Sequence, residues 1–281
     1  MIPAEFDYRV AGSVEEAIGL LSGNEDAKLI AGGHSLIPLM KTRLARPSLL
    51  IDVARVPGLT GVSRDGDTLV IGAMTRWHDL ERDPVLREHC AIVADASGQV
   101  GDPQVRHAGT IGGSVAHADP ASDLPTVLLA LDATFVARGP NGERSIAAGD
   151  MFRGFFESAL AHDEILTSIR VPVLDGMGSA YVKFNQRAID WAIVAVAAVV
   201  RHSGGTVSEA RIALTNMGTT PVRASAAEAA MAGASGDAIA AAAALADQGT
   251  DPPEDTFAGA DYRRHLARVL TLRAVEQAMG A

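Results

Sequence analysis

Two glycine-rich segments contain the residue types best suited to bind a phosphate-containing ligand. The first glycine segment, AGGHSL, covers residues 31–36, and the second, TIGGS, covers residues 110–114. Paired glycines permit positive φ angles and let backbone N–H groups approach a ligand without a Cβ in the way. Hydroxyl groups of Ser35, Thr110 and Ser114 add donors. One such segment is also typical of a plain tight turn, but the pair predicts two sides of a pyrophosphate site that needs no lysine.

Neither segment follows a common nucleotide-binding motif, because G-x-G-x-x-G and the G-K-[ST] ending are both missing. His34 and His117 adjoin the segments without metal-ligand spacing, so we expect them to form hydrogen bonds or shape the loops. Asp119 and Asp123 are open to three interpretations: paired catalytic carboxylates, a magnesium site, or partners for sugar hydroxyls. Pro120 and the helix expected after it favour capping for one aspartate and a ligand hydroxyl for the other.

Composition narrows the class of protein. The 281 residues carry a net charge of -10, which argues against a nucleic-acid binder. The single cysteine, Cys90, excludes an internal disulfide and a self-contained iron-sulfur cluster or cysteine zinc site. The N-terminal residues lack the pattern of a secretory signal, and the apolar run 191–200 is about half a bilayer span. We therefore expect a cytoplasmic protein without stable membrane insertion, metal ligands or catalytic side chains of its own.

Strands and helices alternate around both segments. Residues 6–10 read as a strand, 13–23 as a helix with a Ser13–Glu16 capping box, and 27–33 as a strand that ends in the first glycine segment. The carboxyl end of a strand is a common ligand position in α/β folds. Further on, the sequence predicts a continuous helix over 76–89, then a helix and a strand over 122–139, a strand over 163–172, a hairpin at Gly204 and Gly205, and helices over 224–246 and 260–279. The expected fold class is α+β.

Four stretches carry a resemblance to a known family: AGGHSLIPLMKTR, TIGGSVAHADPASDLP, DEILTSIRVP and YVKFNQRAIDWAIVAVAAVV. Together they resemble the FAD-binding medium subunit of the molybdenum hydroxylases, the group of xanthine dehydrogenase and aerobic carbon monoxide dehydrogenase. The resemblance implies an FAD-binding domain of the PCMH type over residues 1–175, with subdomains of about 1–57 and 58–175. It implies a C-terminal domain over residues 178–281, with a three-stranded antiparallel sheet and helices.

The same resemblance implies a set of FAD-binding residues. The two glycine segments would wrap the pyrophosphate, Asp123 would lie near the polar chain of the flavin, and Ile165 and Leu166 would contact the ring region through their backbone. Lys183 would lie near the flavin ring, and Trp191 would stand where relatives often stack a tyrosine. The full set is Ala31, Gly32, Gly33, His34, Ser35, Leu36, Thr110, Ile111, Gly112, Gly113, Ser114, Asp123, Ile165, Leu166, Lys183 and Trp191. Ser114 departs from the Asn or Asp common in relatives, which alters one hydrogen bond to the cofactor.

The function implied is electron transfer within a larger enzyme. A large molybdenum-cofactor subunit and a small subunit with two [2Fe-2S] clusters are the expected partners, in a dimer of heterotrimers that passes electrons to an external acceptor. His34, where many relatives have glutamine, favours the carbon monoxide dehydrogenase branch. A xanthine, nicotine-type heterocycle or aldehyde dehydrogenase is the alternative within the family. A non-catalytic ligand-binding α/β module is the alternative from another class.

Overall fold

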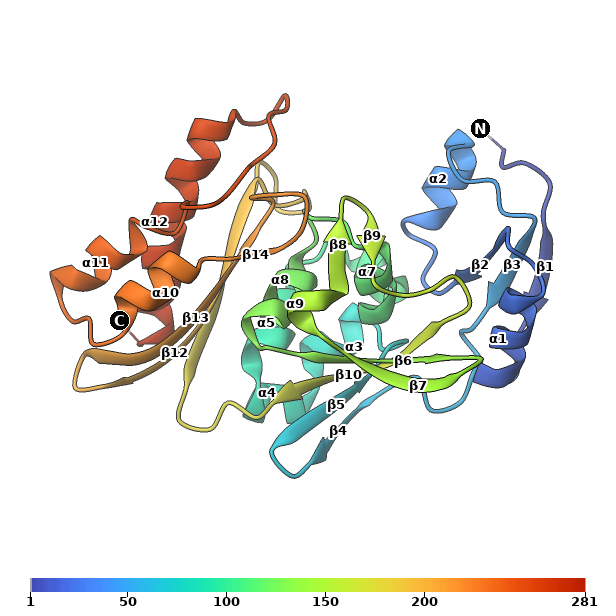
Figure 1. Cartoon of the computed structure of the whole chain (residues 1–281), viewed down its shortest axis with the longest axis horizontal. Coiled ribbons are helices and arrows are strands. Elements are labelled where there is room, and N and C mark those ends of the chain that lie inside the picture. The colour runs from blue at the N-terminus through green and yellow to red at the C-terminus, as the bar shows by residue number, and fades with distance from the viewer. Residues whose placement is uncertain (1, 281) are drawn as a thin grey trace.

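The computed structural model describes residues 2–280, which fold into three parts joined side by side (Figure 1). In Figure 1 the N-terminal part lies at the right, a central part holds the largest sheet, and the C-terminal part lies at the left. Helices and strands are mixed throughout, so the predicted α+β class is confirmed. No helix among residues 2–280 is long and apolar enough to cross a membrane.

The N-terminal part is a small parallel sheet with the strand order β1-β3-β2. Its elements are β1 (Asp7–Val10), α1 (Val14–Ser22), β2 (Ala27–Ile30), α2 (Leu36–Thr42) and β3 (Leu49–Asp52). The predicted cap of α1 is present, since the Ser13 side chain accepts the Glu16 N–H at 3.1 Å. Glu16 Oε2 in turn accepts the N–H of Gly12 at 2.8 Å, one residue earlier than a capping box requires.

The central part is a five-stranded antiparallel sheet with the order β4-β5-β10-β6-β7. Its strands are β4 (Val62–Asp65), β5 (Thr68–Gly72), β6 (Thr134–Gly139), β7 (Gly142–Ala147) and β10 (Ile165–Pro172), with the small pair β8 (Phe152–Gly154) and β9 (Glu157–Ser158). The helices are α3 (Trp77–Arg82), α4 (Pro84–His89), α5 (Ala91–Gly98), α6 (Pro103–Ala108), α7 (Ile111–His117), α8 (Asp123–Ala130) and α9 (Ala148–Met151).

Two predictions for the central part were wrong in detail. The single helix expected over 76–89 is split into α3 and α4, because Asp83 takes an extended conformation and caps α4, where Pro84 is the first residue. The second glycine segment is not a loop. Its residues form the first turn of α7, which Thr110 caps by accepting the N–H of Gly113.

The C-terminal part contains the predicted antiparallel sheet and helices. Its long strands are β11 (Gly178–Phe184), β12 (Val194–Ser203) and β13 (Thr206–Thr215), and the two-residue β14 (Val222–Arg223) extends the sheet. The helices are α10 (Ser225–Met231), α11 (Asp237–Ala243) and α12 (Ala260–Ala278). The hairpin turns at Gly204 and Gly205 as predicted, and both have positive φ (57° and 77°).

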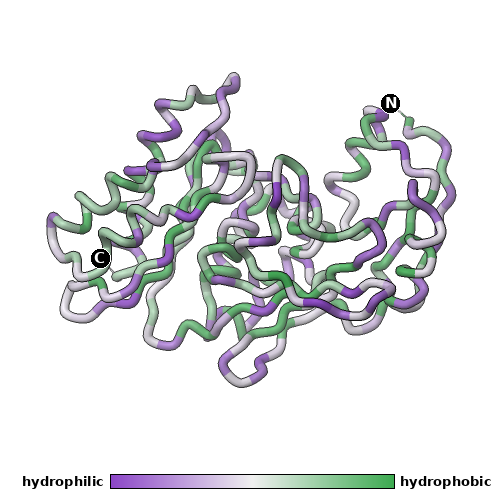
Figure 2. Tube along the Cα trace, in the orientation of Figure 1, coloured by the Kyte–Doolittle hydropathy of each residue, from purple (hydrophilic) through white to green (hydrophobic). Residues whose placement is uncertain are grey.

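Strand β12 is buried on both faces over residues 194–200 and joins the central and C-terminal parts. Ala195, Ala197 and Val199 belong to the hydrophobic core of the central part, whereas Val194 and Val196 belong to the core beneath the C-terminal helices. Successive side chains of a strand point to opposite faces, which explains the alternation. Figure 2 shows that hydrophobic residues concentrate in these inner strands and helices, while hydrophilic residues gather at the peripheral turns. The two parts therefore share one sheet as a common wall.

Candidate functional site

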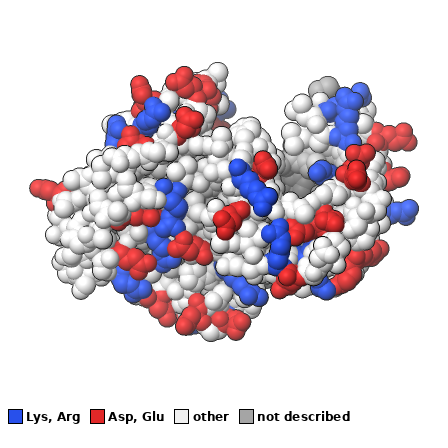
Figure 3. Space-filling view, in the orientation of Figure 1, with Lys and Arg blue, Asp and Glu red and all other residues white. Residues whose placement is uncertain are grey.

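A cavity of about 690 Å³ lies between the N-terminal part, α7 and β11. The surface in Figure 3 is hollowed between the N-terminal part and the middle of the molecule. Every predicted site residue except Ile111 lines the cavity. Ile111 is fully buried, so its side chain packs α7 against the core of the central part. The structure thus brings together residues that are up to 160 positions apart, from Ala31 to Trp191.

The first glycine segment connects the end of β2 to the start of α2 and presents free backbone donors. Gly33 has a φ of +71°, which an L side chain rarely adopts. Its carbonyl accepts the N–H of Ile37 at 2.9 Å and so begins α2. Within residues 2–280, the N–H groups of residues 32–36 donate no hydrogen bond. Five consecutive donors at the wall of a cavity are suited to an anionic ligand.

Two other glycines are needed for backbone packing rather than for positive φ. A Cβ on Gly32 would lie 2.2 Å from the carbonyl oxygen of Ala108, and one on Gly112 would lie 2.6 Å from that of Ala73. Among the four paired glycines only Gly33 has positive φ. The expectation of positive φ therefore holds for one glycine, and Gly32 is glycine because the first glycine segment packs against the backbone of Ala108 and Gly109.

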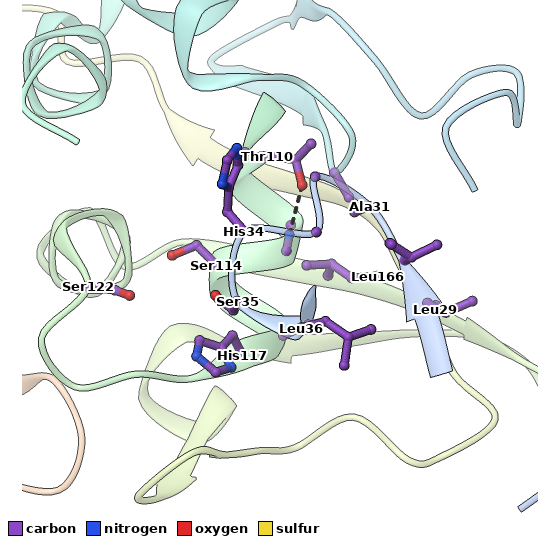
Figure 4. A pocket seen from close by; sticks show the side chains of 18 of the residues that line it. Leu29, Ala31, His34, Ser35, Leu36, Thr110, Ser114, His117, Ser122 and Leu166 are labelled. Atoms are coloured by element: carbon purple, nitrogen blue, oxygen red, sulfur yellow. Dashed lines mark hydrogen bonds between the residues drawn. The ribbon is translucent and has the colours of Figure 1, made fainter. Parts of the chain in front are cut away.

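The second glycine segment uses its backbone donors within the protein. The N–H of Gly112 donates to Ala73 O at 2.8 Å, and that of Ser114 donates to Thr110 O at 3.2 Å. The N–H of Gly113 donates to Thr110 Oγ1 at 3.2 Å, the bond dashed in Figure 4. A helix N-terminus would otherwise offer these donors to a ligand. The first turn of α7 therefore contributes the hydroxyl of Ser114 instead of its amides.

Three serine hydroxyls point into the same space from different elements. Figure 4 shows Ser35 before α2, Ser114 on α7 and Ser122 before α8 around this space, with His117 below them. The ring of His117 lies 4.8 Å from that of Phe156, and burial lowers the pKa of this histidine. The ring of His117 therefore packs against the turn between β8 and β9. His34 is exposed at the rim of the cavity.

Asp123 and Lys183 form a buried ion pair across the boundary between the central and C-terminal parts. Lys183 Nζ lies 3.1 Å from Asp123 Oδ1 and also donates to the carbonyl of Gln99 at 3.0 Å. Tyr181 Oη donates to Asp123 Oδ1 at 2.6 Å. Burial raises the pKa of Asp123, and the charge of Lys183 and the Tyr181 hydrogen bond oppose that rise. The pair, with both side chains at least 96% buried, forms one wall of the cavity.

Asp119 has a local role in the turn before α8. Its Oδ1 accepts the N–H of Ala121 at 2.9 Å, and burial raises the pKa of its carboxyl group. Asp119 therefore closes this turn and does not cap α8, whose N-cap residue is Ser122, so the capping role predicted for one aspartate was wrong. The carboxylate of Asp123 is instead bound by Tyr181 and Lys183.

The far end of the cavity is formed by the start of β10 and by the segment before β12. Ile165 and Leu166 are buried at the start of β10, and a β-bulge between Leu166 and Ser168 interrupts the ladder with β6. Trp191 is 57% exposed at the mouth. A large exposed aromatic beside buried aliphatic residues is suited to contact a planar ring.

Sequence reasoning missed Tyr181 and Ser122. Tyr181 lies two residues before Lys183 on β11, so both side chains point to the same face of the strand. The alternation of side chains along a strand could therefore have placed Tyr181 beside Lys183 from the sequence. Ser122 lies within ASDLP directly before α8, where a serine reads as a helix cap, although its side chain accepts no capping hydrogen bond.

The donors lining the cavity fit FAD. Lys28 and Lys183 are the lysines of the lining and no arginine is present there, so a diphosphate would be held by the N–H groups of the first glycine segment and by serine hydroxyls. Asp123 balances the charge of Lys183. The volume of about 690 Å³ lies within the range of roughly 300–1,000 Å³ found for cofactor and ligand sites.

Family models match almost the whole chain in two consecutive pieces. Residues 4–174 match the FAD binding domain in molybdopterin dehydrogenase. Residues 179–278 match the CO dehydrogenase flavoprotein C-terminal domain.

Individual proteins are similar over the same length. The carbon monoxide dehydrogenase medium chain of Hydrogenophaga pseudoflava is 43% identical, over 99% of this chain and 98% of its own. A subunit of the 6-hydroxypseudooxynicotine dehydrogenase complex of Paenarthrobacter nicotinovorans is 41% identical, over 99% and 96%. A solved carbon monoxide dehydrogenase from Hydrogenophaga pseudoflava superimposes with a TM-score of 0.97 and 45% identity, over 100% of this chain and 99% of that one.

Proposed function

This chain belongs to the family of FAD-binding domains of the molybdopterin dehydrogenases, and we propose that it serves an aerobic carbon monoxide dehydrogenase. As a member it is the flavoprotein subunit of an oxidoreductase, with FAD as its cofactor. The observation that carries the finer proposal is the 43% identity, over 99% of this chain, to a carbon monoxide dehydrogenase medium chain. Family membership also removes the alternative of a non-catalytic ligand-binding module.

We propose that the cavity of about 690 Å³ is the FAD site and that the residues lining it have the roles given by the resemblance. The free N–H groups of residues 32–36 and the hydroxyl of Ser114 would hold the pyrophosphate. Leu166, Lys183 and Trp191 would surround the ring system. Bound FAD supplies a redox centre that accepts and releases electrons singly or in pairs. The side chains of this chain bind and orient the cofactor.

The proposal of partner chains rests on the relatives, which are a medium chain and a complex subunit of larger dehydrogenases. We propose that electrons reach the cofactor from iron-sulfur clusters of a partner chain, because Cys90, the one cysteine of this chain, cannot hold a cluster by itself. The proposed assembly has a large molybdenum-cofactor subunit and a small iron-sulfur subunit, paired into a dimer of heterotrimers that delivers electrons to an external acceptor in the cytoplasm. We propose a division of this chain into domains at residues 1–175 and 178–281, with subdomains of about 1–57 and 58–175.

A second candidate function is the same role in a dehydrogenase for an organic substrate. The observation in its favour is the 41% identity to the pseudooxynicotine dehydrogenase subunit, only slightly below the 43% for the carbon monoxide dehydrogenase chain. The two functions differ in a substrate pocket that lies on the large partner chain.

The test uses the three chains purified as a complex and this chain purified alone. The complex should be reduced by carbon monoxide and not by purines, N-heterocycles or aldehydes. This chain alone should show a flavin absorption spectrum that none of these substrates bleaches. Bleaching of the complex by an organic substrate only would support the second function. Bleaching of the isolated chain by substrate would contradict the electron-transfer role.

A further inference from the structure

Strand β1 forms an open edge of the N-terminal sheet, on the side away from the proposed FAD site. The order β1-β3-β2 leaves one side of β1 without a neighbouring strand among residues 2–280, and Figure 1 shows β1 at the outer margin of the molecule. Strand β2, at the opposite edge, lines the cavity, whereas no residue of β1 does. An open edge presents unpaired backbone N–H and C=O groups that can pair with another strand.

The hydrogen bonds of β1 show which of its residues face the open edge. The N–H of Asp7 donates inward to the carbonyl of Ser48 at 2.8 Å. In a parallel pair of strands, alternate residues bond to the neighbouring strand, and the residues between them direct their N–H and C=O groups to the other side. The backbone groups of Phe6, Tyr8 and Val10 therefore point away from β3 and are available to a further strand.

The side chains of these same residues are apolar and exposed. Phe6 is 37% exposed, Tyr8 is 52% exposed and Val10 is 41% exposed, and all three lie on one face of the strand. The hydroxyl of Tyr8 donates to Asp52 at the end of β3, which holds the ring against the sheet. The outer strands of the central sheet, β4 and β7, expose charged residues such as Arg64 instead. Exposed charges discourage an edge strand from pairing, and this face of β1 has none.

The opposite face of β1 carries two unlike charges. Asp7 and Arg9 are exposed, and neither forms an ion pair within the described part of the chain. If two copies of β1 pair antiparallel about Tyr8, Asp7 of each copy lies opposite Arg9 of the other. In the same register Phe6 lies opposite Val10, and the two Tyr8 rings are neighbours. A shift of two residues in either direction would instead place Asp7 opposite Asp7 or Arg9 opposite Arg9.

We propose that β1 is a self-association surface, on which β1 of a second copy of this chain pairs antiparallel about a two-fold axis through Tyr8. The occupant is a second copy because the edge is complementary to itself on both faces. A two-fold interface makes every contact twice with the roles of the residues exchanged, and the Asp7–Arg9 pairs meet that condition. One strand from each copy is a smaller contact than a permanent interface, so the dimer is weak and depends on concentration.

Association is measured first on the full chain without other chains, by sedimentation velocity from about 1 µM to about 1 mM protein. The weight-average mass should rise from the 29.1 kDa of one copy towards twice that value. Half of the chains should be paired at a concentration on the order of 100 µM. A chain that is still monomeric at about 1 mM would overturn the proposal.

Charge reversal tests the register. Asp7→Arg and Arg9→Asp each place like charges opposite one another at two symmetric positions, so each should weaken self-association by about tenfold. An equimolar mixture of the two variants should associate about tenfold more tightly than either variant alone, because every cross-strand pair is again of opposite sign. The double variant should associate like the parent protein. Asp65→Arg is the matched control, because Asp65 is exposed on the outer strand β4, and it should leave association unchanged.

Three results would contradict pairing through β1. Association that persists in both single variants would assign it to another surface, and a mixture no tighter than its components would refute the register. Loss of the partner chains from the purified complex in Asp7→Arg, without self-association of the parent chain, would assign the edge to a partner chain. Flavin content should equal that of the parent protein in every variant, because β1 lies outside the cavity. The outcome is therefore independent of the proposed function.

Discussion

Removing one partner of the Asp123–Lys183 pair should destabilise the protein strongly, and removing both charges should destabilise it less. Lys183 is 3% exposed, so Asp123→Asn leaves an ammonium group buried without a counter-charge. Breaking a buried pair in this way costs about 3–5 kcal/mol. In a chain of this size about 1 kcal/mol corresponds to roughly 2–4 °C in Tm, so we expect a fall of about 10 °C.

The double variant Asp123→Asn with Lys183→Met provides the decisive comparison. It leaves no buried charge, and the amide oxygen at position 123 can still accept the hydroxyl of Tyr181. Its Tm should therefore lie above that of either single variant. The unfolding midpoint of all four proteins, measured by near-ultraviolet circular dichroism, checks this order.

The pH dependence of Lys183→Met is a separate check on the same pair. Without the lysine charge, burial raises the pKa of Asp123 further than in the parent protein. A raised folded pKa means that the folded state holds a proton which the unfolded state has lost, so stability falls as pH rises through that pKa. The Tm of Lys183→Met should therefore lie closer to that of the parent protein at about pH 5 than at about pH 8. An equal loss at both pH values, or a double variant less stable than both single variants, would refute the coupling.

Three further predictions concern the cavity and the core. FAD should be bound non-covalently, so acid precipitation should release all flavin into the supernatant, and flavin retained in the pellet would contradict this. Gly32→Ala should abolish FAD binding, because its Cβ would lie 2.2 Å from the Ala108 oxygen, whereas Gly19→Ala, with nothing within 4 Å, should leave flavin content unchanged. Burial raises the pKa of the Cys90 thiol to about 12, so iodoacetamide should label it at neutral pH only after unfolding, and rapid labelling of the native chain would show that the site is open.

Local chemistry in the sequence was enough to predict most elements around the site. Ser13 and Glu16 predicted the start of α1, and the adjacent Gly204 and Gly205 predicted the β12–β13 hairpin, because caps and tight turns depend on residues that are neighbours in the chain. The glycine segments themselves located one wall of the cavity. The helix over 76–89 was mispredicted at Asp83, where a local capping preference overrode the helical pattern.

Tertiary structure decided how those elements combine and what each glycine does. Nothing local to Gly112 reveals that its Cβ would meet the backbone of Ala73, nor that its N–H donates to the carbonyl of Ala73. Asp123 and Lys183 are 60 positions apart, and their pairing requires the side chain of Lys183 on β11 to reach the start of α8 across the boundary between the two parts. The sequence pattern shows that residues 194–200 of β12 are all apolar. Which core each of its faces enters depends on the order of strands and helices in space, because burial is a property of the assembled packing and not of any one segment.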